Sequence, residues 1–350
     1  MSLKSYLRLL LLGIFAITSC KKNNTSPISA NKPKDVDIYI AGYSLAGNGY
    51  YIATYWKNGA ETRLSDTSTA SYAYGIAVSG GDIYAFGTVG YYSTQSVYWK
   101  NGVATALSND GGQTGVNAMA VQGSDVYLCG YLEKNQQIAM YWKNGVPVPL
   151  VAAGSIESIA SSIFVQGSDV YVAGFSVDVR GFKAAVYWKN GVMTRLTDAA
   201  TTSSANDIRV IGNDLYVAGM MINPLGQQIA TYWKNGVANS VADNVNYSEG
   251  TSIAVSGQDV YMSGFLSERT AFFTIPVVWK NGVTTKIVDS IGGISTIRQP
   301  FAKTVVSNGT DIYVSGPFRD NLAAYWKNGK LVPFTNDQRS IGYNILLVQK

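Results

Sequence analysis

The sequence predicts an all-β protein: a seven-bladed β-propeller with four antiparallel strands per blade, closed by the C-terminal strand. Three observations lead to this prediction: a repeated Trp-Lys-Asn-Gly motif, a second motif of the same period, and chain ends that complement each other. All the tryptophans carry the first motif, at spacings of 43 to 47 residues, and they are Trp56, Trp99, Trp142, Trp188, Trp233, Trp279 and Trp326. Units of this length with four short strands are typical of propeller blades.

The second motif is Asp-apolar-Tyr followed by two small or apolar residues and then glycine. It begins at Asp37, Asp82, Asp125, Asp169, Asp214, Asp259 and Asp311. In each unit we expect strand 1 to end at a valine, as at 253–255, and strand 2 to begin at the aspartate, as at 259–264. Strand 3 should end at Tyr-Trp-Lys, and Asn-Gly then favours a type I′ hairpin turn into a short strand 4, such as 192–196, because both turn positions need positive φ.

The two ends of the chain together supply one of the seven units. The valine that ends strand 1 occurs six times internally, at Val78, Val121, Val165, Val210, Val255 and Val306. A seventh copy follows at the C-terminus, where residues 345–349 resemble 162–166, whereas the first unit begins directly at Asp37 with strand 2. We therefore expect the last strand to pair with the first and to leave no open sheet edge.

The composition indicates a globular chain and excludes several kinds of chemistry. Of 350 residues, 47% are hydrophobic and 14% charged, and none is histidine, which excludes histidine-based catalytic triads and zinc ligation. The formal charge is +5. Without Lys4 and Arg8 it is 25 − 22 = +3, which does not indicate nucleic-acid binding. We expect neither a cofactor nor a metal, and we expect Cys129 to be a small core residue.

Residues 1–19 are predicted to form a signal peptide. Lys4 and Arg8 precede an apolar run at 9–17 that is too short to span a bilayer. The sequence Ile17-Thr18-Ser19-Cys20 resembles the lipobox of bacterial lipoproteins, which implies lipidation at Cys20; an ordinary signal peptide is the alternative. Residues 20–34 would then be the lipidated N-terminus and a flexible tether, and 35–350 the propeller. Lys21-Lys22-Asn23 resembles outer-membrane lipoproteins of Bacteroidota, which implies a lipid anchor in the outer membrane, on either of its faces.

The repeat also resembles a known family. Asp-Val-Tyr-Val-Ala-Gly at 169–174, with a tryptophan later in the unit, resembles the kelch repeat over residues 37–350. The kelch double glycine is single here, and the tryptophan directly follows a tyrosine. The resemblance therefore implies the propeller architecture and no functional residue.

The repeated residues themselves are interpreted as structural. We expect the tryptophans and the strand 2 tyrosines to be core, since apolar residues that recur at fixed positions are usually buried. The aspartates are expected to cap the turn into strand 2 by accepting backbone N–H groups. Lys57 and its six equivalents are expected to be solvated turn residues that discourage edge pairing.

Function is expected on the opposite face of the ring. The 1–2 and 3–4 turns are nearly identical in all units and define a uniform face, whereas the 2–3 and 4–1 connections differ and define a variable face suited to recognition. Asp207, Arg209 and Lys303 are charged residues at strand 1 positions and are expected to line the central channel. The candidate binding residues in the connections are Tyr91, Tyr92, Lys134, Arg180, Glu268, Arg269, Arg298, Arg319 and Asp320.

Three functions fit these features. The first is a non-catalytic binding or scaffold lipoprotein of the cell envelope that holds a protein or glycan partner on the variable face. The second is a glycosidase or lyase that uses paired carboxylates, the acid/base pair still available without histidine; its candidate carboxylates are Glu133, Glu157, Asp178, Asp207, Glu249, Glu268 and Asp320. The third, by architectural analogy alone, is an outer-membrane assembly factor.

Overall fold

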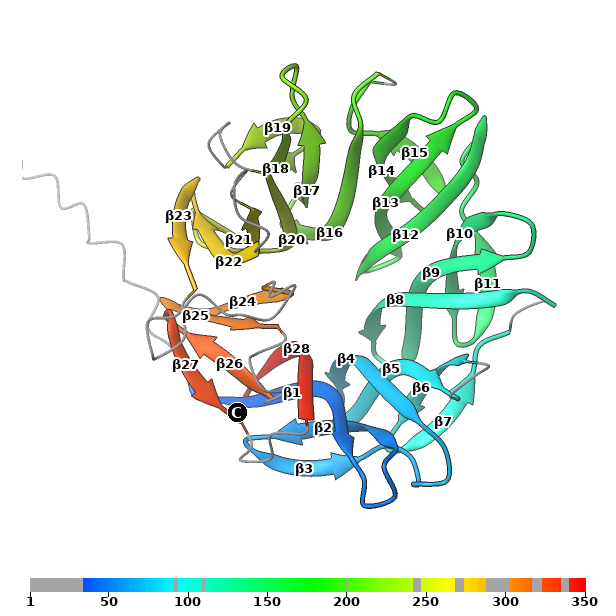
Figure 1. The fold of residues 1–350 in the computed structure, drawn as a ribbon, viewed down its shortest axis with the longest axis vertical. Helices are drawn as coiled ribbons and strands as arrows, with labels where there is room; N and C mark the ends of the chain where they lie inside the picture. Colours follow the sequence, from blue (N-terminus) through cyan, green and yellow to red (C-terminus); the bar gives the residue numbers. More distant parts are fainter. Residues whose placement is uncertain are drawn as a thin grey trace, which may run out of the picture.

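The protein is a ring of seven blades around a central channel (Figure 1). The computed structural model describes residues 34–90, 94–108, 111–198, 200–241, 247–267, 274–287, 302–316, 323–334 and 340–350. These residues form seven four-stranded sheets whose neighbouring strands pair antiparallel, which confirms the predicted fold class. The predicted signal peptide and tether, and Cys20 with them, lie outside the described residues. No helix long and apolar enough to cross a bilayer occurs in the described part of the chain.

Each blade runs from an inner strand 1 at the channel to an outer strand 4. Blade 1 is β28 (Ser340–Gln349), β1 (Val36–Leu45), β2 (Tyr51–Lys57) and β3 (Ala60–Arg63); blade 2 is β4 (Ser71–Ser79), β5 (Asp82–Val89), β6 (Gln95–Lys100) and β7 (Val103–Ala106); blade 3 is β8 (Gln113–Gln122), β9 (Asp125–Glu133), β10 (Gln137–Lys143) and β11 (Val146–Pro149). Blade 4 is β12 (Ser155–Gln166), β13 (Asp169–Asp178), β14 (Lys183–Lys189) and β15 (Val192–Arg195); blade 5 is β16 (Ser203–Ile211), β17 (Asp214–Ile222), β18 (Gln228–Lys234) and β19 (Val237–Ser240). Blade 6 is β20 (Tyr247–Ser256), β21 (Asp259–Ser267), β22 (Thr274–Lys280) and β23 (Val283–Lys286); blade 7 is β24 (Thr304–Asn308), β25 (Asp311–Ser315), β26 (Ala324–Lys327) and β27 (Lys330–Pro333).

The ring closes as the sequence predicts. The C-terminal strand β28 is the inner strand of blade 1 and pairs antiparallel with β1, from Val36 opposite Gln349 to Ser44 opposite Ser340. One blade is thus built from both ends of the chain, and β1 has a hydrogen-bonded neighbour on each side. Figure 1 shows the blue and red ends of the chain side by side in this blade.

The core consists of seven clusters, each between two neighbouring blades. In each cluster the tryptophan of one blade packs against strand 2 of the preceding blade: Trp99 against Tyr39 and Ala41, for example, and Trp188 against Tyr127 and Cys129. All seven tryptophans are at most 4% exposed, which confirms the prediction that they are core. Cys129, which is free and buried, stands where five other blades have alanine or serine, small residues that leave room for the indole of the next blade; blade 2 has Phe86 at this position.

A hydrogen-bond network repeats seven times on the uniform face and corrects two predictions. In blade 5, Asp214 Oδ1 accepts from Asn235 Nδ2 at 2.8 Å and Asp214 Oδ2 forms an ion pair with Lys234 Nζ at 2.8 Å. Asn235 Oδ1 in turn accepts the Leu215 backbone N–H. The asparagine of the hairpin turn therefore takes the capping role expected of the aspartate, because antiparallel pairing brings the end of strand 3 beside the start of strand 2.

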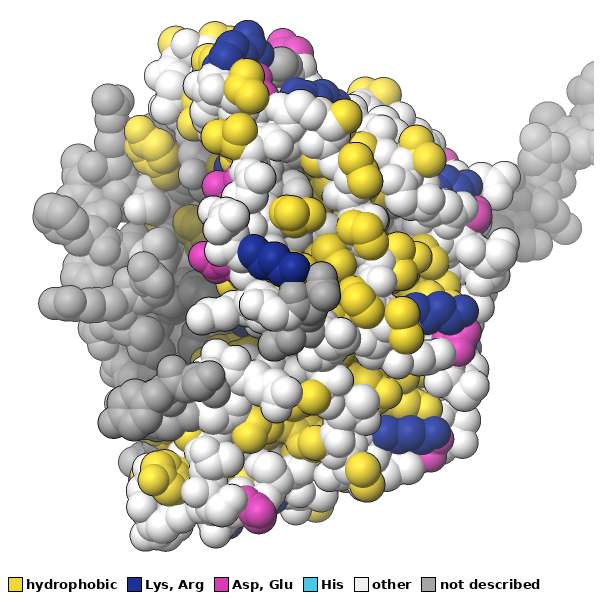
Figure 2. All heavy atoms as spheres, turned by 90° about the vertical axis from the view of Figure 1, so that its right-hand side faces the viewer, with side chains coloured by type: hydrophobic (Ala, Val, Ile, Leu, Met, Phe, Trp, Pro, Cys, Tyr) yellow, Lys and Arg dark blue, Asp and Glu magenta, His cyan; other side chains and the backbone are white. Residues whose placement is uncertain are grey.

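The repeated lysines, expected to be simply solvated, are held in this network. Each lies about 5 Å from the ring centroid of its strand 2 tyrosine and is paired with its aspartate, with 40–51% of the side chain exposed. The hydrogen bonds from its lysine and from its hairpin asparagine hold the pKa of each aspartate below its ordinary value. In blade 5 the bond from Lys234 is the larger cause, and in blade 1 the bond from Asn58 is. Figure 2 shows basic and acidic side chains side by side along one edge of the molecule.

The N-terminal end of the described chain lies at the uniform face. The Lys34 backbone N–H donates to Asn308 Oδ1 at 3.1 Å, and the Lys34 carbonyl accepts from Asn308 Nδ2 at 2.7 Å. Asn308 is the last residue of β24, at the 1–2 turn of blade 7. The chain therefore enters the propeller on the side opposite to the variable face.

Candidate functional site

A β-bulge in the inner strand shapes the channel. In six blades the pairing of strands 1 and 2 shifts by one residue beside the glycine of the Asp-apolar-Tyr motif, as between Ala205 and Asp207 in β16. A Cβ atom on that glycine would meet a strand 1 carbonyl oxygen well inside 3.0 Å, closer than real Cβ atoms approach; for Gly219 this oxygen belongs to Ser204. The motif glycine is therefore required by the close approach of two backbones.

The bulge places one extra residue per blade at the channel. These residues are Tyr343, Tyr74, Asn117, Ser161, Asn206 and Thr251 in blades 1 to 6, and Lys303 at the equivalent position in blade 7. All seven line a cavity of about 470 Å³ at the centre of the ring. This volume lies within the range of roughly 300–1,000 Å³ that is usual for small-molecule sites.

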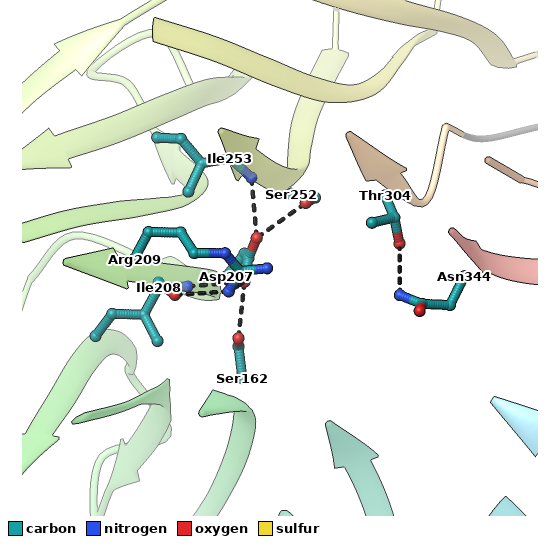
Figure 3. Close-up of polar contacts among 8 residues, drawn as sticks. All are labelled: Ser162, Asp207, Ile208, Arg209, Ser252, Ile253, Thr304 and Asn344. Atoms are coloured by element: carbon teal, nitrogen blue, oxygen red, sulfur yellow. Dashed lines mark hydrogen bonds and ion pairs between the residues drawn. The ribbon is translucent and has the colours of Figure 1, made fainter. Parts of the chain in front are cut away.

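Asp207 organises one side of the channel (Figure 3). Its Oδ1 accepts from Ser162 Oγ and from Arg209 Nη1, each at 2.7 Å. Its Oδ2 accepts from Ser252 Oγ at 2.9 Å and from the Ile253 backbone N–H at 3.0 Å. The side chain therefore links blades 4, 5 and 6, and its charge is neutralised by Arg209 on its own strand. Because both oxygens are engaged by the chain's own donors, we assign Asp207 a structural role.

Other polar side chains continue this ring across the remaining blades. Asn344 Nδ2 donates to Thr304 Oγ1 at 3.1 Å, between blades 1 and 7 (Figure 3). Asn117 Nδ2 donates to the Ala160 carbonyl at 2.8 Å, and Thr251 Oγ1 donates to the Ala302 carbonyl of the next blade. The channel wall is thus mainly hydroxyl and amide groups held in place by bonds between blades.

Lys303 is the cation of the channel that stands apart from these networks. Its Nζ lies 4.4 Å from the ring centroid of Tyr343, a cation–π contact across the junction of blades 7 and 1. Burial lowers the pKa of Lys303, and no neighbouring carboxylate opposes this effect within the described residues.

A strip of five tyrosines extends from the channel to the variable face. Tyr74 and Tyr343, in the channel, have ring centroids 5.9 Å apart, and Tyr343 is 5.7 Å from Tyr43. Tyr43 in turn lies 5.1 Å from Tyr72 and 4.8 Å from Tyr51, at the 2–3 connection of blade 1. All five rings are half-buried. We call these residues the tyrosine strip.

Sequence reasoning missed the tyrosine strip, although one signal was present. Tyr74 and Tyr343 occupy the strand 1 position at which the other repeats have Asn, Ser, Thr or Lys, so aligning the repeats singles them out. Their contact depends on ring closure, which brings β28 beside β4 and joins positions nearly 270 residues apart.

The carboxylates near the channel are occupied by the chain's own donors. Glu249 accepts from Asn206 Nδ2 at 2.7 Å and from Gln228 Nε2 at 3.1 Å. Burial lowers the pKa of Lys183, and the charges of Glu249 and Glu157 oppose this effect. Within the described ranges, no group of three or more acidic or cysteine side chains is arranged to hold a metal ion.

The structure brings together three of the twelve predicted binding residues and separates two others. Asp207, Arg209 and Lys303 line the channel. Lys134 lies exposed in the 2–3 connection of blade 3, and Arg180 lies in that of blade 4, where it pairs with Asp178 at 2.7 Å. Neither lines the channel. The other predicted residues lie outside the described residues, and they are Tyr91, Tyr92, Glu268, Arg269, Arg298, Arg319 and Asp320.

Comparisons with known proteins support the fold alone. No protein-family model matches the chain, and no curated protein matches it. Among solved structures, a puromycin hydrolase superposes with a TM-score of 0.57 at 11% identity over 87% of this chain, and a Mycobacterium tuberculosis puromycin-hydrolyzing peptidase with a TM-score of 0.53 at 10% identity over 87%. This chain covers 54% of each of those proteins. A putative TolB from Agrobacterium tumefaciens superposes with a TM-score of 0.45 at 11% identity. The superposition covers 76% of this chain and 93% of the TolB chain. The chain is therefore similar in fold to the matched part of the two puromycin-hydrolysing proteins.

Proposed function

We propose that the protein is a non-catalytic binding lipoprotein of the cell envelope that receives a protein or glycan partner on its variable face. The observation that carries this proposal is the tyrosine strip, which leads from the variable face into a polar channel containing Lys303. Partly exposed aromatic side chains are enriched at recognition surfaces because they offer contact area at small entropic cost.

A binding role suits the channel better than carboxylate catalysis does. General acid/base work needs a carboxyl group that can exchange a proton with a substrate. Asp207 is engaged by a guanidinium and four further donors, and Glu249 accepts from two amide groups. Both carboxylates are therefore committed to holding the inner strands in place.

Lipidation at Cys20 is part of the proposal and fits the position of Lys34. Because the chain enters the propeller at the uniform face, an anchor on Cys20 would attach its tether on the side of the ring opposite to the variable face and leave that face unobstructed. The lipobox supports lipidation of Cys20, and the Lys21-Lys22-Asn23 sequence that follows it supports an anchor in the outer membrane. Replacing Cys20 by Ala should move the protein from the membrane pellet to the soluble fraction; continued co-sedimentation would contradict the lipid anchor.

The binding role is tested by affinity capture from solubilised envelope. We expect a partner that is lost when Tyr43 and Tyr72 are both replaced by Leu, because this removes the outer part of the tyrosine strip. The control is Lys330→Gln, an exposed residue on the outermost strand β27, which should capture the partner as the unaltered protein does. Equal capture by all three proteins would contradict a partner on the variable face.

A further inference from the structure

The channel contains one cation whose charge is not balanced by the described residues around it. Arg209 is paired with Asp207, whereas Lys303 Nζ contacts the face of Tyr343. The nearby Glu249 is directed to Asn206 and Gln228, on the blade 5 side of its strand. A shielded ammonium group without a counterion loses hydration that its surroundings do not replace. A ligand carboxylate beside Lys303 would restore that balance.

The surroundings of Lys303 favour a polyhydroxylated ligand. The tyrosine strip begins at Tyr343 and offers a row of half-buried rings, on which the C–H faces of sugar rings can stack. The facing wall offers amide oxygens, because Asn117 and Asn206 use their Nδ2 groups to bond between blades and keep Oδ1 as an acceptor for hydroxyl groups. An acidic peptide could pair with Lys303. It would have no sugar rings to stack along the tyrosine strip and no hydroxyl groups to donate to the amide oxygens.

We propose that the mouth of the channel binds the end of a carboxylated saccharide, with the carboxylate at Lys303 and the sugar rings along the tyrosine strip. This inference rests on the proposed binding function and names the ligand class for it. The cavity of about 470 Å³ admits the end of a saccharide, and the remaining units would follow the strip onto the variable face.

The test measures the affinity of three probes for the purified protein by calorimetry. The probes are a short oligogalacturonate, its uncharged methyl ester and an oligoglutamate peptide. We expect the oligogalacturonate to bind and the other two to bind at least about tenfold more weakly, since a charge-assisted contact contributes on the order of 1.5–3 kcal/mol. Added salt should weaken the oligogalacturonate complex.

Variants at the two key positions separate the contributions. Lys303→Gln should reduce the affinity for oligogalacturonate about tenfold. Lys303→Arg should retain most of the affinity, and Lys330→Gln all of it. Tyr343→Leu should weaken both the charged probe and its ester, because it removes the stacking surface that both share. Thermal unfolding of each variant, compared with the unaltered protein, verifies that the ring is intact.

Several outcomes would overturn the inference. Equal binding of oligogalacturonate and its ester, undiminished binding to Lys303→Gln, or tighter binding of the peptide would each contradict it, as would the absence of binding to all three probes. If the affinity capture described above succeeds while these probes fail, the binding function stands and only the ligand class is wrong.

Discussion

Replacing Gly219 by Ala tests the idea that the motif glycine makes the bulge possible. A Cβ atom there would overlap the Ser204 carbonyl oxygen of β16, which is backbone and cannot rotate away. Strands β16 and β17 would have to separate by on the order of 1 Å, which strains the bulge that carries Asn206 and the neighbouring Asp207 network. Overpacking of this kind costs about 1–3 kcal/mol, and weakened hydrogen bonds add about 1 kcal/mol. We therefore expect a loss of about 3 kcal/mol in the free energy of unfolding.

Guanidinium unfolding followed by tryptophan fluorescence is the assay, since all seven tryptophans are buried between blades. The matched control is Gly47→Ala, because Gly47 has open space around the position of a Cβ and does not have positive φ. This control should stay within about 0.5 kcal/mol of the unaltered protein. If Gly219→Ala also stayed within that range, strand 1 would adapt without cost and the reasoning about the bulge would be wrong.

Three further predictions follow from the fold. Asn235 has a φ of 51°, which glycine tolerates and alanine does not. Asn235→Gly should lower the free energy of unfolding by about 1 kcal/mol, because its hydrogen bonds are lost, and Asn235→Ala should lower it by about 1–2 kcal/mol more through backbone strain. Equal urea midpoints for the two variants would contradict this. Removing residues 341–350 should expose the edge of β1. The truncated protein should then associate, as measured by sedimentation, or lose its cooperative transition in urea unfolding. An unchanged, stable monomer would count against closure. The folded-state pKa values of the repeated aspartates, such as Asp169, are lowered mainly by the paired lysine, so their stabilisation is present above the unfolded pKa of about 4 and is lost as the pH falls below it. Urea midpoints should therefore match at pH 7 and 5 and drop by pH 3, and a midpoint that rises on acidification would refute this account.

The architecture was predictable because its signals are local and repeated. Asn-Gly specifies each hairpin turn by its tolerance of positive φ, and the structure has positive φ at all seven asparagines. Ring closure was also predictable, because residues 345–349 supply the one strand missing from the first unit.

The bulges were not predictable, because no common residue type marks them. Tyr74, Asn117 and Ser161 share a position and little chemistry, and the shift in register is fixed by the glycine of the partner strand. Asp207 and Lys303 were found only because charge interrupts otherwise small or apolar strand 1 positions. The partner of each repeated aspartate was misjudged for a related reason: it lies about 20 residues away, on a strand that returns beside it.

The position of β1 has a mechanical consequence. A pull on the chain at Lys34 acts along the axis of β1, which is bonded to β28 on one side and to β2 on the other. A force in this direction loads both ladders in shear, so many hydrogen bonds must yield together, whereas a strand pulled sideways from a sheet edge is unzipped one bond at a time. The junction between the two chain ends thus also resists force at the point where the N-terminal segment meets the propeller.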